Sequence, residues 1–246
     1  HNILPKISLF ASTKELPLCA SADIDNDGRS EIVVLEKTGK NSVYGLTVVP
    51  YPVKGEAVTP NIKCIILESS PHNLFFGDYN NDGLVDMLVI SEKSYITFLN
   101  NGTNDITTWR KIYGGSVLKE SDLIEAGDFN GDGIPDFISL RGNKLKLALG
   151  NGNGNFTECP SQSFSGISGM NTDNSQMMVY DFNNDGKSDV IITKAKGKLD
   201  SYWLESKGNS LSLKTKSALS KDITENSIFA TVGDYNGDGN VELLNY

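Results

Sequence analysis

A nine-residue acidic pattern, D-x-[DN]-x-D-G-x-x-[DE], occurs five times along this chain of 246 residues. Its first aspartates are 50 to 55 residues apart, at Asp23, Asp78, Asp128, Asp181 and Asp234. Average residue usage would produce one copy only about a few times per million positions, so five copies in register indicate a repeat. A repeat of this length is typical of a solenoid or a propeller.

The first copy shows which chemistry each loop offers. Asp23, Asp25 and Asp27 present side-chain oxygens, position seven can add a backbone carbonyl, Glu31 closes the set, and Gly28 allows the sharp turn. Such a set suits a hard cation: calcium takes six to eight oxygens in flexible geometry, whereas magnesium prefers a strict octahedron. No histidine or cysteine lies in any loop, which disfavours zinc and copper. The alternative, a metal-free turn rich in Asp and Asn, would crowd like charges.

The flanking residues exclude the EF-hand, whose similar loop requires a bidentate acid at position twelve between two helices. Short apolar runs rich in branched residues precede and follow each loop, for example LCASA before the first and IVVL after it. Such runs predict buried strands, so each loop is expected to join two adjacent strands. The twelfth positions, none of which can serve as the acid, are Val34, Val89, Ser139, Ile192 and Asn245.

The rest of each period holds further strand candidates. Four short strands per period of about fifty residues match one blade of a β-propeller. The candidates are 44–49 and 63–67 in the first repeat, 95–99 and 109–113 in the second, 144–149 in the third, and 201–204 and 212–216 in the fourth. Loop position two is always large and apolar and is expected to wedge between blades. The residues at this position are Ile24, Tyr79, Phe129, Phe182 and Tyr235.

The loops and their flanks resemble the FG-GAP or VCBS-type calcium-binding propeller repeats, similar to those of integrin alpha-subunit head domains and of bacterial surface and toxin proteins. The segment FFGDYNNDGLVD, from Phe75 to Asp86, retains the Phe-Gly pair before the loop. The resemblance implies about five bound Ca²⁺ ions, one per loop, held by positions one, three, five, seven and nine. The residues so implied are Asp23, Asp25, Asp27, Arg29, Glu31, Asp78, Asn80, Asp82, Leu84, Asp86, Asp128, Asn130, Asp132, Ile134, Asp136, Asp181, Asn183, Asp185, Lys187, Asp189, Asp234, Asn236, Asp238, Asn240 and Glu242.

The expected fold class is all-β: a propeller of about five four-stranded blades, in one domain spanning 1–246, with a calcium loop between the first two strands of each blade. The repeats are expected at about 17–68, 72–114, 122–160, 175–217 and 227–246. The commoner family pattern has seven blades. Either five blades close by pairing 7–10, within 1–16, with the incomplete last repeat, or the chain is a fragment of a larger seven-bladed propeller. The end after the second strand of the fifth repeat favours a piece of something longer.

The charge and composition predict a location outside the cytosol. The formal net charge is −9, and 16 of the 31 acidic residues lie in the five loops. Most of the acidic charge is therefore explained by metal binding in the loops. Calcium is millimolar outside the cell, so it would fill such loops even at modest affinity. We expect a secreted or cell-surface protein without membrane insertion, since no apolar run approaches a membrane span. Lys194, Lys196 and Lys198 lack an aromatic platform, so we expect a solvated edge there and no nucleic-acid site.

The three cysteines are expected to be free or buried thiols. Cys19 lies in the first predicted strand and Cys64 near the outer strand of the same blade. At about 4.8 Å per strand they are too far apart to bond. Cys159 is left without a partner, so disulfides are not expected to hold the fold.

Catalysis has little support in the sequence. Only His1 and His72 could act as a histidine base, and no G-x-S-x-G elbow occurs. We expect a non-enzymatic recognition, adhesion or scaffolding module of a larger surface protein, with a protein or carbohydrate ligand at the cell surface. A calcium-dependent polysaccharide lyase is the enzymatic alternative.

A lectin is the second alternative. It would stack sugars on aromatic rings, although packing between blades is the simpler interpretation of the same residues. The candidates are Trp109, Trp203, Tyr202 and Tyr51.

Overall fold

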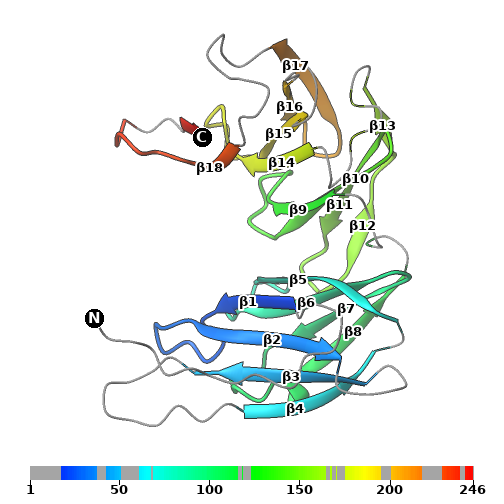
Figure 1. Ribbon diagram of the computed structural model, residues 1–246, viewed down its shortest axis with the longest axis vertical. Helices are drawn as coiled ribbons and strands as arrows, with labels where there is room; N and C mark the ends of the chain where they lie inside the picture. Colours follow the sequence, from blue (N-terminus) through cyan, green and yellow to red (C-terminus); the bar gives the residue numbers. More distant parts are fainter. Residues whose placement is uncertain are drawn as a thin grey trace. The chain divides into compact units, whose positions relative to one another are not determined.

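The computed structural model is built almost wholly from antiparallel strands, which confirms the all-β class (Figure 1). The chain forms two compact units, His1–Glu120 and Ser121–Tyr246. The structure describes residues 18–37, 43–50, 61–67, 69–115, 118, 123–164, 167, 170, 175–194, 201–217, 229–238 and 242–245.

The first unit holds two four-stranded sheets. Their strand orders are β1-β2-β3-β4 and β5-β6-β7-β8, so each strand pairs antiparallel with its neighbour in sequence. A short 3-10 helix, η1 (Ile106–Thr108), lies between β7 and β8. The strands are β1 (Leu18–Ala22), β2 (Glu31–Lys37), β3 (Val43–Val49), β4 (Asn61–Ile66), β5 (Pro71–Gly77), β6 (Asp86–Ser91), β7 (Tyr95–Leu99) and β8 (Arg110–Gly114).

The second unit repeats this order. One sheet runs β9-β10-β11-β12 with β13 also paired to β11, a second runs β14-β15-β16-β17, and β18 pairs with β19. The strands are β9 (Leu123–Gly127), β10 (Asp136–Arg141), β11 (Lys144–Gly150), β12 (Phe156–Glu158), β13 (Gln162–Ser163), β14 (Ser175–Tyr180), β15 (Asp189–Lys194), β16 (Ser201–Ser206), β17 (Leu211–Ser217), β18 (Phe229–Gly233) and β19 (Glu242–Asn245).

Each acidic loop lies between the first two strands of its sheet, as the apolar flanks predict. The predicted strand 95–99 coincides with β7, and 109–113 differs by one residue from β8. The third repeat holds two strands that the sequence did not predict, β12 and β13, which are only three and two residues long. The segment 7–10, proposed to close a ring, lies outside the described residues.

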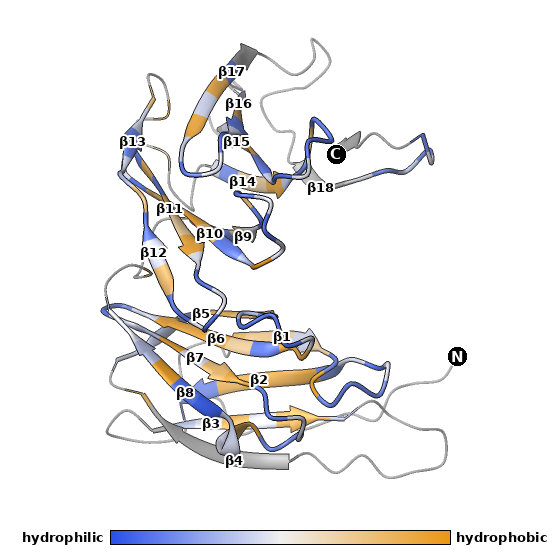
Figure 2. Ribbon diagram, turned by 180° about the vertical axis from the view of Figure 1, so that it is seen from behind, coloured by the Kyte–Doolittle hydropathy of each residue, from blue (hydrophilic) through white to orange (hydrophobic). Residues whose placement is uncertain are grey.

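The core of the first unit lies between its two sheets. Val33 and Leu35 on β2 belong to the same buried cluster as Met87 and Val89 on β6. These side chains alternate along their strands, so one face of each sheet is directed toward the other. Figure 2 shows the apolar colouring concentrated in the central strands of both sheets.

The core of the second unit has the same construction. Ile138 on β10 and Val190 and Ile192 on β15 are fully buried in one cluster, with Tyr202 from β16. Both cores therefore join a sheet to the sheet that follows it in sequence.

Loop position two is buried in some loops and exposed in others. Ile24 and Phe129 belong to the two cores, as the wedge prediction requires, and Tyr79 is also buried. Phe182 is only half-buried and touches Tyr180, with ring centroids 6.1 Å apart. The prediction is wrong for Tyr235, which is 56% exposed. Its ring lies beside Gly233 of its own hairpin instead.

The aromatic residues considered for sugar stacking are mostly packed. Trp109 is 2% exposed and donates its indole N–H to the Thr103 carbonyl at 2.8 Å. Tyr202 is fully buried, and the half-buried Trp203 donates its indole N–H to Asp189 at 3.3 Å. Tyr51 lies outside the described residues. The packing interpretation is therefore correct for Trp109 and Tyr202.

The cysteine prediction agrees with the strand order. Cys19 lies on β1 and Cys64 on β4, with β2 and β3 between them in the sheet. Cys19 is an exposed free thiol and Cys159 is a buried one.

Candidate metal centre

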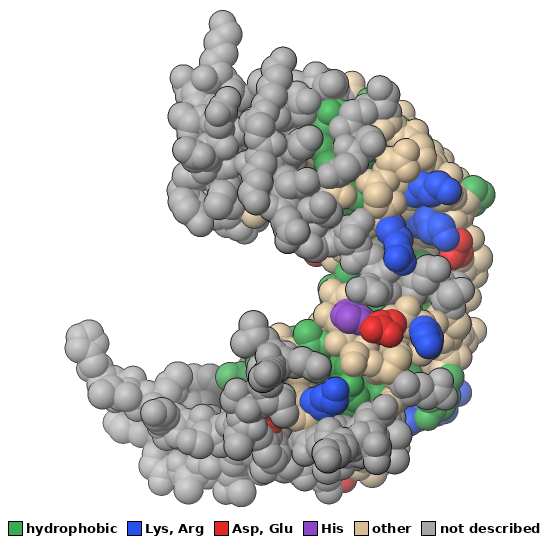
Figure 3. Space-filling view, turned by 45° about the vertical axis from the view of Figure 1, so that its right-hand side comes forward, with side chains coloured by type: hydrophobic (Ala, Val, Ile, Leu, Met, Phe, Trp, Pro, Cys, Tyr) green, Lys and Arg blue, Asp and Glu red, His purple; other side chains and the backbone are tan. Residues whose placement is uncertain are grey.

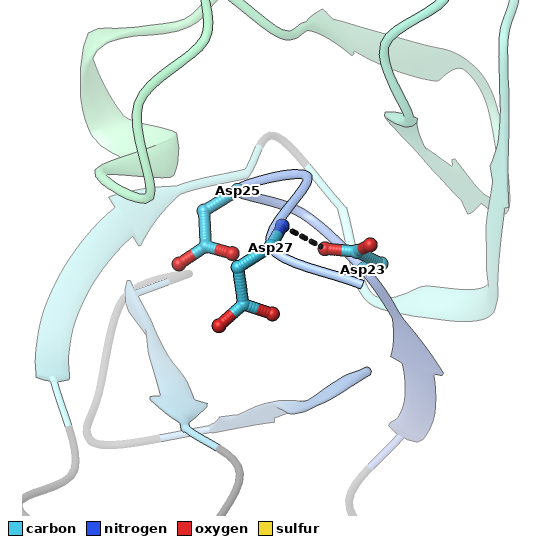
Figure 4. Close-up of side chains that lie close together, drawn as sticks. All are labelled: Asp23, Asp25 and Asp27. Atoms are coloured by element: carbon cyan, nitrogen blue, oxygen red, sulfur yellow. Dashed lines mark hydrogen bonds between the residues drawn. The ribbon is translucent and has the colours of Figure 1, made fainter. Parts of the chain in front are cut away.

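The first acidic loop gathers three carboxylates on one short turn between β1 and β2 (Figure 4). One oxygen from each of Asp23, Asp25 and Asp27 lies within 4.8 Å of the others. The backbone folds around Asp23, whose two oxygens accept N–H groups from Asp27 at 3.0 Å and Gly28 at 2.8 Å. Gly28 has φ +86°, a left-handed conformation that glycine adopts without strain. The pattern D-x-D-x-D-G therefore folds into a compact turn that concentrates negative charge.

The same backbone frame recurs in the later loops. The position-one aspartate accepts from the backbone N–H groups of positions five and six in three of them. These bonds reach Asp78 from Asp82 (3.1 Å) and Gly83 (2.8 Å), Asp128 from Asp132 (3.2 Å) and Gly133 (2.8 Å), and Asp181 from Asp185 (3.1 Å) and Gly186 (2.8 Å). In the fifth loop Asp238 donates to Asp234 at 3.2 Å. Identical spacing thus gives identical local geometry.

Position three separates the first loop from the other four, because it is Asp25 there and asparagine elsewhere. Each asparagine accepts the position-five N–H with Oδ1 and donates Nδ2 to the position-five carboxylate. In the second loop these bonds are 3.1 Å and 2.8 Å, between Asn80 and Asp82. Asn130, Asn183 and Asn236 make the same pair of bonds. These four loops therefore carry one carboxylate fewer than the first, and a neutral amide takes its place.

The acid at position nine is buried behind its loop and bonds to two separate backbone segments. Asp86 accepts the Tyr79 N–H at 2.9 Å with one oxygen and the Asn100 N–H at 2.7 Å with the other. Asp136 repeats this with Phe129 at 2.9 Å and Gly150 at 2.7 Å. Position nine therefore ties its loop to the backbone at the end of the third strand of the same sheet.

Glu31 and Asp189 are the position-nine acids of the first and fourth loops, and they are held in a similar way. Glu31 is 4% exposed and accepts the Ile24 N–H at 3.0 Å, and Asp189 is fully buried and accepts the Ser206 N–H at 2.9 Å. The first, second, third and fourth loops thus share a buried ninth acid that bonds to backbone.

The buried acids hold their protons more tightly than free carboxyl groups. Burial raises the pKa of Asp86 to about 6, against the lowering effect of the N–H groups of Asn100 and Tyr79, and Asp82 and Asp78 raise it further. Burial likewise raises the pKa of Asp136 to about 6. The pKa values of Glu31 and Asp189 are also raised, chiefly by burial and in part by the carboxylates of their own loops. Burial and neighbouring carboxylates therefore both disfavour the charged form of the deepest acid.

Because of this charge arrangement, we expect the metal-free protein to be more stable in mild acid. The pKa of an aspartate in an unfolded chain is about 3.9. The folded chain therefore binds the protons of Asp86 and Asp136 more tightly than the unfolded chain does. Their stabilising contribution is complete below about pH 4 and is lost as the pH rises through about 6. We expect the melting temperature in EDTA, followed by circular dichroism, to fall across this window. The double variant Asp86→Asn, Asp136→Asn should show a shallower fall, and equal slopes would contradict the assignment.

The donor set of the first loop fits a hard divalent cation, because three carboxylates converge from one turn where like charges repel. The backbone of the position-seven residues also belongs to the frame, since each donates its N–H to the position-five carboxylate. These residues are Arg29, Leu84, Ile134 and Lys187. In the fifth loop, Asn240 and the side chain of Glu242 lie outside the described residues.

Three residues that contact the ninth acids lie outside the acidic pattern. Asn100 and Gly150 follow Asp86 and Asp136 by 14 residues, and Ser206 follows Asp189 by 17. Each stands two residues before a glycine with positive φ, namely Gly102, Gly152 and Gly208. That x-x-G turn at a similar distance from each loop is the signal that could have revealed them.

Three overlapping segments of the chain, 78–139, 128–192 and 181–244, match the FG-GAP-like repeat. Each segment begins at the first aspartate of one acidic loop and contains the whole of the next loop. The chain belongs to the FG-GAP-like repeat family. This confirms the family that the loop pattern and the Phe-Gly pair indicate.

Relatives of this FG-GAP-like chain include a T-cell immunomodulatory protein homolog of Plasmodium yoelii yoelii, 26% identical over 215 residues. The match covers 72% of this chain and 30% of that protein. Among solved structures, a lectin from Agrocybe aegerita, described in its specific recognition of non-reducing terminal N-acetylglucosamine, matches with a TM-score of 0.66 and 17% identity. That match covers 93% of this chain and 60% of the lectin chain. The likeness shows a fold consistent with a β-propeller-like architecture.

Proposed function

We propose that this FG-GAP-like chain is an extracellular, calcium-binding recognition module that binds a protein ligand as part of a larger protein. The observation that carries the proposal is the acidic loop, which recurs with one backbone frame in four successive sheets. In the first loop Asp23, Asp25 and Asp27 would hold the ion, with Glu31 buried behind them. A bound cation would neutralise charge that the loops otherwise concentrate.

The role of the metal in this proposal is structural. Each loop connects the first two strands of its sheet, and in the second and third loops the ninth acid bonds to the backbone at the end of the third strand. Neutralising the loop would therefore stabilise three strands of a sheet at one end. Extracellular calcium is abundant enough to fill sites of modest affinity, which supports a secreted or cell-surface location. Within the described part of the chain, no helix could span a bilayer.

The recognition part of the proposal draws on the relatives. The repeats and the name of the Plasmodium relative indicate a non-enzymatic, recognition-type module. Among the described residues drawn in Figure 3, Lys and Arg side chains are interspersed with polar, apolar and acidic ones. A ligand bound mainly by polar and aromatic contacts fits such a surface better than nucleic acid does.

A carbohydrate ligand is the second candidate. The structural likeness to the Agrocybe aegerita lectin bears on the fold, and two of the exposed tyrosine rings, both at strand positions, could stack on sugar. They are Tyr113, 67% exposed on β8, and Tyr180, 42% exposed at the end of β14 beside the fourth loop. These rings replace Trp109 and Tyr202, which are buried, as the residues to test.

Binding to T cells separates the two candidates. The fluorescently labelled chain, in calcium, is incubated with T cells before and after trypsin treatment of the cell surface, and with free N-acetylglucosamine as competitor. We expect binding that trypsin abolishes, that N-acetylglucosamine does not affect and that EDTA reduces at least about tenfold, because a loosened module loses its preorganised surface. Competition by N-acetylglucosamine, with loss in Tyr113→Ala or Tyr180→Ala, would favour the lectin. Absence of binding both to cells and to a glycan array would contradict a recognition function.

A further inference from the structure

In the first unit, a side chain of the second sheet holds the main chain of the first sheet's acidic loop. Asn100 follows β7 and is 6% exposed. Its Nδ2 donates to the carbonyl of Ile24 at 2.9 Å, across 76 residues of sequence, and to the carbonyl of Val85 at 3.0 Å. The N–H of Ile24 is held from the other side by Glu31. Both backbone polar groups of the position-two residue are therefore fixed, one by its own loop and one by the next sheet.

The second unit contains the same contact with a different side chain. Ser206, at the end of β16, is 2% exposed, and its hydroxyl donates to the carbonyl of Phe129 at 2.6 Å. Phe129 occupies position two of the third loop, and its N–H is held by Asp136. Ser206 and Asn100 also resemble each other in a second bond: each donates its backbone N–H to the ninth acid of its own sheet. The two residues are structurally equivalent although their side chains differ.

The third loop is held at a second point, directly beside its first candidate ligand. The N–H of Asp128 donates to the Ser188 hydroxyl at 3.0 Å, and the N–H of Ser188 donates to the Asp128 carbonyl at 2.7 Å. The two segments approach so closely that a Cβ on Gly127 would lie 2.5 Å from Val179. Ser188 immediately precedes Asp189, the ninth acid of the fourth loop. The third and fourth acidic loops are thus joined by a reciprocal pair of hydrogen bonds.

From these contacts we infer that Asn100, Ser188 and Ser206 are positioning residues, each of which fixes the acidic loop of the preceding sheet. None of them belongs to the candidate ligand set. They act on backbone at positions one and two, between and beside the residues that carry the carboxylates of that loop. A loop held in its folded geometry loses less conformational entropy when it binds an ion, so metal affinity depends on the neighbouring sheet. Only this metal-affinity consequence rests on the calcium proposed above.

Amide hydrogen exchange of the full chain in EDTA tests the positioning role without metal. Ser206→Ala should raise the exchange rate of the 128–135 loop about fivefold, the effect of losing one hydrogen bond. The 23–30 loop, in the other unit, should keep its wild-type rate. Asn100→Ala should give the reverse pattern: exchange of the 23–30 loop rises, and the 128–135 loop keeps its wild-type rate.

Two further variants of the same turn serve as controls. Ser206→Thr keeps the hydroxyl and should restore the wild-type rate. Asn209→Ala alters an exposed side chain that follows Gly208 in this turn, and it should leave the rate unchanged. Equal exchange of the 128–135 loop in Ser206→Ala and Ser206→Thr would overturn the inference. A uniform rise across all peptides of the unit would also overturn it, because it would show general loosening.

Calcium titration of the same exchange separates this inference from the proposed function. In the wild type, calcium should slow exchange of every loop. Ser206→Ala should raise the calcium concentration for half-protection of the 128–135 loop about fivefold, and that of the 23–30 loop should not change. If calcium protects no wild-type loop, the calcium proposal fails, whereas the exchange pattern in EDTA still decides the positioning role. If calcium protects the 128–135 loop equally in both proteins, the link to metal affinity is wrong.

Discussion

EDTA is expected to lower the melting temperature of this protein by about 15–25 °C. If free calcium is about ten times each dissociation constant, an independent site adds about 1.4 kcal/mol of stability. Five such loops would add about 7 kcal/mol, comparable to the whole stability of a typical domain. For a chain of this size, a loss of 1 kcal/mol lowers the melting temperature by about 2–4 °C. Calorimetry or circular dichroism in calcium and in EDTA measures the difference.

Re-addition of calcium to the chelated protein is the control for this experiment. The melting temperature should recover fully with calcium and only in part with an equal concentration of magnesium, which resists a flexible oxygen cage and keeps its waters. Metal analysis of the dialysed protein should find about one calcium ion per loop. An unchanged melt in EDTA, with no metal released, would contradict the calcium proposal.

The sequence predicts the loops and their place in the fold because both depend on local chemistry. The D-x-[DN]-x-D-G order fixes a turn through bonds between residues two to five positions apart, such as those from Asp27 and Gly28 to Asp23. Apolar runs on either side fix the two strands that the turn connects. Local spacing and strand pattern are visible in one sequence, so these features follow without a structure.

The position-nine acids have a role that the sequence pattern does not reveal. The sequence presents Glu31 and Asp86 as further oxygens around an ion, whereas the structure shows them accepting backbone N–H groups. Every residue except proline carries a backbone N–H, so nothing in the side chain of a partner indicates that role. The only sequence signal for the partner of Asp86 at residue 100 is the glycine two residues later, Gly102, and the sheet register shows the contact itself.

The contacts between sheets also could not be predicted from the sequence. Asn100 and Ser206 perform one task with an amide and a hydroxyl, across 76 and 77 residues. The burial of Trp109 was equally hidden. Its indole N–H donates to a backbone carbonyl in its own turn, and this bond favours burial of a ring that could equally have bound a ligand. The type of side chain alone does not show whether it will bond within the fold or bind a ligand, since the acceptor in each case is a backbone carbonyl.

Asp86→Ala is expected to destabilise the first unit by about 2–4 kcal/mol. The change leaves the N–H groups of Tyr79 and Asn100 without their buried acceptor, at a cost of about 1–3 kcal/mol each. Removal of a fully buried carboxylate, whose pKa burial raises to about 6, returns part of that loss. Chemical denaturation in calcium measures the change. Glu92→Ala, at an exposed acid just after β6, should stay within about 0.5 kcal/mol of wild type.

Repeating this measurement in EDTA separates the two roles of Asp86. If the carboxylate served only as a metal ligand, Asp86→Ala and wild type would have equal stability once the metal is removed. The two backbone bonds exist without metal, so we expect a loss of about 1–3 kcal/mol to persist in EDTA. The additional loss seen only in calcium then measures the metal-dependent part. A variant that is destabilised in calcium and matches wild type in EDTA would show that the bonds to Tyr79 and Asn100 contribute nothing to stability, and that position nine acts through the ion alone.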